Sequence, residues 1–353
     1  GEVIMWEENL REQIVDLQSP CEKGRLEEFL NKQDLKLDQD VEYSIALYKG
    51  EKIVATGSFS GRVLKSIAVD DEHKNAGLSA RILTGLLREE YERGRTHLFI
   101  YTKPENRSVF SELGFYTIAQ VPSRVILMEN RPEGIKNYLA EISKEKAEGG
   151  GISAAVVVNC NPFTLGHKYL IEYAASRCEK LHIFVLWEER SVFPAELRYS
   201  LIKEGVGHLP NVVLHKGGNY IISAATFPSY FIKEYQEQVE THARLDLEVF
   251  SKYIVPTLGI SKRFVGDEPY CEVTAAYNRI MQEVLPACGV GVEVVPRLTY
   301  DGLAVSASRV RELIRMNKID EVKGLVPEST YRFLLSSEAQ EIIKHIQLSC
   351  QRH

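Results

Sequence analysis

The chain has 353 residues, which is long for one domain and typical of two, since domains commonly hold about 100–200 residues. Its composition, 44% hydrophobic and 26% charged, is that of a folded globular protein. A net charge of −6 gives no field that would draw the chain to nucleic acid or to an anionic membrane, so neither is expected as a partner. A cytoplasmic protein is predicted, because we find neither a long apolar run nor a basic-then-apolar leader. The six cysteines are scattered, as expected for free thiols.

The first recognisable elements are a strand at 62–70, a turn, and an amphipathic helix at 78–94. The turn at 74–79 resembles the phosphate-holding loop of the GNAT acetyltransferases, and residues 98–115 resemble the fourth strand and the closing Leu-Gly-Phe of that superfamily. The resemblance implies a GNAT-like α+β fold, with Lys74, Gly77 and Ser79 placed to hold a pantetheine nucleotide. Phe110 stands where many active members carry a general-acid tyrosine. The resemblance therefore implies binding without acetyl transfer.

The domain boundaries are read from changes in pattern. A first domain is expected over 1–130, and a helical linker that ends in glycines over 131–150. From 151 to 335 short apolar runs alternate with helical patterns, which predicts βαβ units and a doubly wound, Rossmann-like parallel sheet. Within it, a long helical region is expected over 230–259 and a final helical pair closes the domain. A C-terminal helix is expected over 336–353.

Two segments of the second domain have the residue types of a phosphate site. Asn161–His167 follows the domain's first strand and opens a helix, where unpaired N–H groups and the helix dipole favour an anion. Asn-Pro is a common turn and a histidine at a helix start is more often a capping residue, so this segment alone is not decisive. Ser306–Arg311 supplies the second element, with hydroxyl groups at a helix start and an arginine one turn inside.

The two segments resemble the T/HxGH and ISSTxxR motifs of the nucleotidyltransferase superfamily, in the expected order. The resemblance implies ATP with Mg²⁺, and attack of an oxygen nucleophile on the α-phosphorus. It assigns catalysis to Thr164, His167, Ser308 and Arg311; ATP contacts to Asn161, Phe163, Gly166 and Ser306; and the adenosine side to Gly266 and Asp267. Ala307 departs from the motif's second serine. Asp267 and Glu268 are equally well explained as ordinary loop carboxylates.

Nearly the whole chain resembles the citrate lyase ligase family, including a segment at 220–231 that by resemblance lines the substrate side. The family joins acetate, through acetyl-AMP, to the thiol of a dephospho-CoA-like prosthetic group on the acyl carrier subunit of citrate lyase. No protein nucleophile is required, so the cysteines need not be catalytic. Two other classes stay open: a transferase that joins a nucleotide to a cofactor precursor, and a non-catalytic acyl-CoA sensor.

Overall fold

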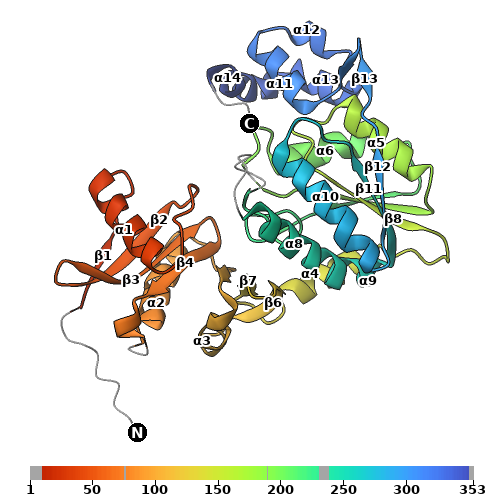
Figure 1. Ribbon diagram of the computed structural model, residues 1–353. Coiled ribbons are helices and arrows are strands. Elements are labelled where there is room, and N and C mark those ends of the chain that lie inside the picture. The colour runs from red at the N-terminus through yellow and green to blue at the C-terminus, as the bar shows by residue number, and fades with distance from the viewer. Residues whose placement is uncertain (1–9, 75–76, 189, 230–237, 350–353) are drawn as a thin grey trace. The chain divides into compact units, whose positions relative to one another are not determined.

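The fold comes from a computed structural model that describes residues 10–74, 77–188, 190–229 and 238–349. The chain forms two compact units, Gly1–Ile135 and Lys136–His353 (Figure 1). Each unit has its own sheet and its own hydrophobic core. We describe them separately.

The first unit is a seven-stranded sheet in the order β1-β2-β3-β4-β5-β7-β6, in which only the β4–β5 pair is parallel. Apolar residues of α2 and α3 pack on one face of the sheet, and those of α1 on the other. The strands are β1 (Leu10–Ile14), β2 (Tyr43–Lys49), β3 (Lys52–Ser60), β4 (Val63–Val69), β5 (Phe99–Thr102), β6 (Tyr116–Val121) and β7 (Val125–Glu129). The helices are α1 (Pro20–Lys32), α2 (Leu78–Glu92) and α3 (Arg107–Glu112).

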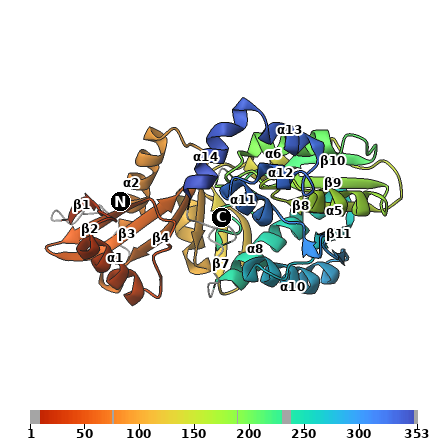
Figure 2. The ribbon, with the colours of Figure 1, turned by 90° about the horizontal axis from the view of Figure 1, so that it is seen from above.

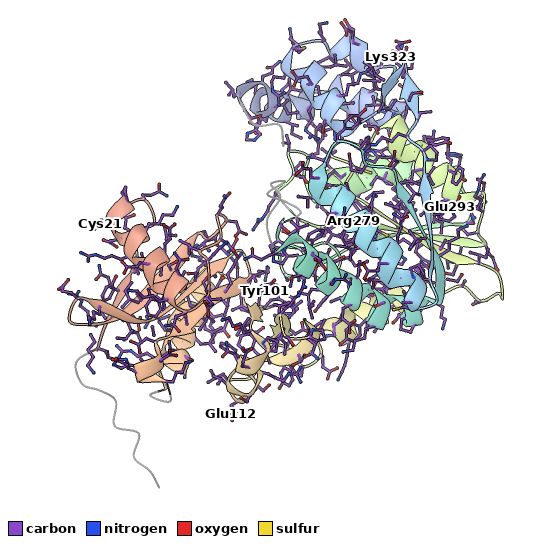
Figure 3. All side chains as sticks on the ribbon, viewed as in Figure 1. Cys21, Tyr101, Glu112, Arg279, Glu293 and Lys323 are labelled. Carbon is purple, nitrogen blue, oxygen red and sulfur yellow. The ribbon has the colours of Figure 1, made fainter. Side chains whose placement is uncertain are left out.

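The parallel pair at the centre of this sheet is short. Tyr101, labelled in Figure 3, lies on β5 just beyond the paired residues. Phe110 is buried in the core, so the phenyl group at the position of the expected general acid is a packing residue here.

The second unit is built on a parallel sheet in the order β10-β9-β8-β11-β12. The strands are β8 (Ser153–Val158), β9 (Lys180–Val185), β10 (Val212–Lys216), β11 (Ile260–Gly266) and β12 (Gly291–Val295). Helices α5 (Leu165–Ala175) and α6 (Ala195–Gly205) pack on one face, whereas α8 (Val239–Val249) and α10 (Glu272–Ala287) pack on the other. The predicted fold class, an α+β unit followed by a doubly wound parallel sheet, is confirmed.

The segment before this sheet belongs to the core of the second unit. Helix α4 (Gly134–Ser143) buries Ile142 against the α8–α10 face, and the Tyr138 hydroxyl donates to the carbonyl oxygen of Lys216 at 3.0 Å. The predicted long helical region is observed where it is described, as α8, a π-helical turn over 250–254, and α9 (Val255–Leu258). Residues 230–237 of that prediction lie outside the described residues.

The prediction of a final helical pair is wrong, because three helices lie between residues 306 and 335. A small hairpin of β13 (Thr299–Tyr300) and β14 (Leu303–Ala304) is followed by four helices, whose apolar sides close over a cluster of their own. These are α11 (Ala307–Arg315), α12 (Ile319–Val322), α13 (Glu328–Leu334) and α14 (Gln340–Leu348), which gather at one end of the unit in Figure 1. Figure 2 shows α13 beside α6, where the Ser329 hydroxyl donates to the Leu201 carbonyl oxygen. The helices are short, which hides their periodicity in the sequence.

Among the described helices, none is long and apolar enough to cross a membrane. Five cysteines are free thiols, and the sixth, Cys350, lies outside the described residues.

Candidate active site

The strand order of the second unit defines where a ligand would bind. β8 leads to β9 and β10 on one side, and the chain then crosses to β11 and β12 on the other, so the winding reverses between β8 and β11. In open α/β sheets the ligand crevice lies at the carboxyl ends of the strands at this reversal. Both predicted motifs and the predicted adenosine segment are found there, because Asn161 follows β8, Gly266 ends β11, and Arg311 reaches Asn161.

Thr164 and His167 form a reciprocal cap at the start of α5. The Thr164 hydroxyl oxygen accepts from the His167 N–H, and His167 Nδ1 accepts from the Thr164 N–H at 3.1 Å. Because a main-chain N–H can only donate, the proton of the neutral imidazole lies on Nε2. Burial, followed by the charges of Arg297 and Arg311, lowers the pKa of His167 to about 4. His167 is therefore an uncharged Nε2–H donor at neutral pH.

The second motif opens α11 and is tied to the first. Ser306 is the N-cap and accepts from the Arg309 N–H at 3.2 Å, while the exposed Ser308 hydroxyl lies 3.3 Å from Arg311 Nη2. Arg311 is nine-tenths buried, and its Nη1 donates to the Asn161 carbonyl oxygen. Burial lowers the pKa of Arg311 to about 10, so the guanidinium remains charged at neutral pH. Arg311 thus joins the two motifs.

Gly166 sets how closely the two helix starts approach. A Cβ atom at this position would lie 2.7 Å from the main-chain oxygen of Val305, the residue before the Ser306 cap. Real Cβ atoms essentially never come so close to a main-chain oxygen. The glycine of the first motif is therefore required by packing against the second, whatever its contact with a ligand.

Asn161 and Phe163 have structural partners in this arrangement. The Asn161 side-chain oxygen accepts from the Phe193 N–H at 3.0 Å. Phe163 is completely buried; its ring lies 6.3 Å from that of His167 between centroids, and its carbonyl accepts from the Thr330 hydroxyl at 2.9 Å. Both residues position the start of α5, and a direct contact with ATP remains a prediction for each.

Arg297 is a residue of this site that the sequence did not reveal. It follows β12, and its guanidinium donates to the Asp267 carbonyl oxygen at 2.7 Å and to the Glu268 carboxylate at 2.6 Å. It thereby fixes the predicted adenosine segment after β11, and its charge acts on His167. Asp267 is exposed and Glu268 is engaged with Arg297. The only sequence signal was an arginine directly after a strand, which is too common to be informative.

A second residue that the sequence missed is Arg198, which is fully buried on α6. Its guanidinium donates to four main-chain oxygens, at distances of 2.8–3.1 Å: those of Asn159, Leu186, Glu188 and Phe193. These oxygens belong to the segments that follow β8 and β9. Arg198 therefore holds the carboxyl ends of two neighbouring strands in fixed positions beside the start of α5.

The predicted phosphate loop of the first unit is described in part, since residues 75 and 76 lie outside the described residues. Gly77 is the N-cap of α2 in the left-handed conformation, with φ of 69° and no side-chain cap bond. Lys74 is exposed and forms an ion pair with Asp71 at 2.5 Å, and Ser79 lies in the first turn of α2. The described part thus offers a helix start without a capping side chain.

Comparisons with known proteins agree with this organisation. Residues 153–334 match the family model for the citrate lyase ligase C-terminal domain. The chain is 39% identical over 327 residues to [Citrate [pro-3S]-lyase] ligase of Escherichia coli (strain K12), covering 91% of each chain. It is 42% identical over 320 residues to the [Citrate [pro-3S]-lyase] ligase of Klebsiella pneumoniae, covering 90% of this chain and 93% of that protein.

Two of the solved structures that resemble the chain each cover about a third of it. Escherichia coli ElaA is 12% identical with a TM-score of 0.31, covering 35% of this chain and 99% of that one. An aminoglycoside 6'-N-acetyltransferase complexed with coenzyme A is 12% identical with a TM-score of 0.30, covering 34% and 95%. Scores this low carry no weight, and the fold assignment rests on the observed sheets.

Fold and comparisons together define a two-domain enzyme of the ligase class, with a Rossmann-like parallel sheet in its second domain. The chain belongs to the citrate lyase ligase family.

Proposed function

We propose that the second unit activates acetate with ATP and that the acetyl group passes to a thiol on the acyl carrier subunit of citrate lyase. An acetate oxygen attacks the α-phosphorus of ATP, pyrophosphate leaves, and acetyl-AMP forms. The thiolate of the dephospho-CoA-like prosthetic group then attacks the acetyl carbonyl carbon and expels AMP. The observation that carries the proposal is the junction of the two motifs at the sheet's reversal point, made by Arg311 and the close approach of Gly166 to Val305.

The residues suit this chemistry because it needs donors where negative charge develops. The Nε2–H of neutral His167, the exposed Ser308 hydroxyl and the Arg311 guanidinium are donors at the two helix starts. Thr164 contributes by fixing the His167 ring through Nδ1. In this reaction these residues orient the phosphates and stabilise their negative charge, and no covalent enzyme intermediate is required.

We assign magnesium to the ATP phosphates. Within the described part of the chain, no group of three or more His, Cys, Asp or Glu side chains is arranged to hold a metal ion. Mg²⁺ in ATP-using sites typically keeps several waters and binds through phosphates with one or two carboxylates. Asp267, which is exposed directly after β11, is the carboxylate best suited to bind the ion together with the phosphates. When bound, the ion would neutralise phosphate charge.

Acetate-dependent exchange of labelled pyrophosphate into ATP tests adenylation without the carrier protein. We expect exchange that requires both acetate and Mg²⁺ in the wild type, and a loss of about 100- to 1000-fold in a folded His167→Ala variant, the usual cost of one charge-stabilising donor. Exchange that continues without acetate would contradict the proposal. Near-normal exchange in the variant would remove His167 from the mechanism.

We further propose that the helix start at Gly77 docks the pantetheine nucleotide of the prosthetic group. In support, Gly77 lies in the left-handed region at an uncapped helix start, and Phe110 cannot act as a general acid. Gly77→Val should raise the KM for the carrier acceptor while leaving pyrophosphate exchange intact. Gly94→Val is the matched control, since Gly94 has a φ of 75°, open space around it, and lies just beyond the other end of α2. Equal effects of both variants would refute docking at Gly77.

A further inference from the structure

Asn159 is a polar side chain at the edge of the second unit's sheet, and nothing in the proposed reaction uses it so far. It directly follows β8, at the reversal between β8 and β11, and stands two residues before the first motif. The residue is half-buried. Ligand crevices of open α/β sheets lie at the carboxyl ends of the strands beside such a reversal, so Asn159 is placed where a substrate would be bound.

One end of the Asn159 carboxamide is fixed, and the other end is available for a ligand. The Ser191 hydroxyl donates to Asn159 Oδ1 at 3.2 Å, and the main-chain oxygen of Asn159 accepts from Arg198 Nη1 at 2.8 Å. Among the described residues, Asn159 Nδ2 has no hydrogen-bond partner. A carboxamide nitrogen carries two N–H donors, so the fixed side chain offers both of them at the carboxyl edge of the sheet.

The side of the crevice on which Asn159 is held differs from the side assigned to the nucleotide. Its anchors Ser191 and Arg198 belong to the loop and the helix that follow β9. The donors proposed for the phosphates lie at the starts of α5 and α11, and the proposed adenosine segment follows β11. In an in-line displacement the attacking oxygen and the leaving pyrophosphate lie on opposite sides of the α-phosphorus. This leaves the β9 side of the crevice, with Asn159, for the attacking acid.

A neutral donor suits a carboxylate that must act as a nucleophile. An arginine fork binds both oxygens of a carboxylate, whereas an amide N–H holds one oxygen and leaves the other able to attack. The buried Arg198 guanidinium bonds four main-chain oxygens, including that of Asn159, so its positive charge lies behind the amide and favours an anion without pairing with it directly. The Glu188 carboxylate is engaged by the Ala224 N–H at 2.7 Å.

We propose that Asn159 Nδ2 donates to one carboxylate oxygen of the short acid and directs the other oxygen at the α-phosphorus, and that Ser191 is the positioning residue that fixes the carboxamide. The inference rests on the proposed function for the identity of the acid and of ATP. The free carboxylate oxygen forms the bond to phosphorus as the bond to pyrophosphate breaks. The Asn159 amide transfers no proton and serves to select and orient a carboxylate.

The test compares Asn159→Ala and Asn159→Asp with Asn317→Asp in acetate-dependent pyrophosphate exchange. Asn159→Asp keeps the size of the side chain but replaces the donor by a carboxylate that repels acetate. Asn317 is exposed just beyond the far end of α11, so Asn317→Asp adds the same charge away from the crevice. We expect the KM for acetate to rise about tenfold in Asn159→Ala, as for the loss of one hydrogen bond to a charged group, and further in Asn159→Asp. The KM for ATP should change little, and Asn317→Asp should match the wild type.

Ser191→Ala tests the positioning role and decides the question if the Asn159 variants do not fold. It leaves the amide in place but removes its anchor, so the KM for acetate should rise about threefold, again with little change in the KM for ATP. Thermal melts of the same samples show whether each variant is folded. An unchanged KM for acetate in folded variants would overturn the inference, and so would equal rises in both KM values, the result of a merely structural role. If the wild type shows no acetate-dependent exchange at all, the proposed function fails instead.

Discussion

Replacement of Gly166 by alanine should separate the two motifs by a fraction of an ångström. The added Cβ would lie 2.7 Å from the Val305 main-chain oxygen, where about 3.4 Å is ordinary contact, so the helix starts must move apart or tilt. Overpacking of this kind typically costs about 1–3 kcal/mol. For a domain of this size that corresponds to a fall in Tm of roughly 2–12 °C. The fold should survive at 25 °C.

The effect on catalysis should exceed the effect on stability. A misplacement of about 1 Å near the reacting groups can cost about 100-fold in rate, so a shift of about half that size should cost roughly tenfold or more. The assay is pyrophosphate exchange at 25 °C, with thermal melts of the same samples. Gly291→Ala is the matched control, because its Cβ would meet nothing closer than 3.8 Å and Gly291 lies at the opposite, amino end of β12. Normal exchange in folded Gly166→Ala would refute the requirement for close approach of the two motifs.

Three further expectations follow from the geometry. In Gly266→Ala, the added Cβ would meet nothing closer than 3.9 Å in the free protein, so the Tm should be unchanged. If the main chain approaches the nucleotide at this position, the KM for ATP should rise about tenfold, and an unchanged KM would contradict that role. Arg311→Ala should lose about 100-fold in exchange and Arg309→Ala about twofold, since the Arg309 guanidinium donates to an exposed main-chain oxygen, that of Tyr300. The reverse order would show that the motif register is wrong. Burial lowers the pKa values of the paired His182 and His215 to about 4 and about 3. Because imidazoles in the unfolded chain bind protons below about pH 6.5, the stability from this neutral pair is present above that pH and is lost as the pH falls towards 4. The free energy of unfolding measured in urea should therefore decrease from pH 7 to pH 5, and a flat profile would refute this expectation.

The sequence predicted those parts of the molecule that follow from local patterns. Alternating apolar runs and helical periods placed the parallel sheet, and His167 was correctly placed in the first turn of the helix that follows the first strand. The helices after residue 306 were undercounted, because each is too short to show a clear period. The relation between Gly166 and Val305 depends on tertiary approach, which no local pattern contains.

The sequence could not predict the supporting residues of the candidate site, for the same reason. Arg198 and Arg297 act through main-chain oxygens that are distant in sequence, and their neighbours in the chain give no motif. A buried arginine inside a helical pattern looks the same as a surface residue until the opposing segment is known. Identifying these residues required the fold.

Transfer of oxygen from acetate to AMP tests the proposed adenylation most directly. If an acetate oxygen attacks the α-phosphorus, and the thiol later expels AMP from the carbonyl carbon, one ¹⁸O atom from doubly labelled acetate must end in the phosphate of AMP. Mass spectrometry of AMP formed in the presence of the loaded acyl carrier subunit should show one labelled oxygen for each acetyl thioester made. Unlabelled AMP, or label in pyrophosphate or inorganic phosphate, would contradict activation through acetyl-AMP.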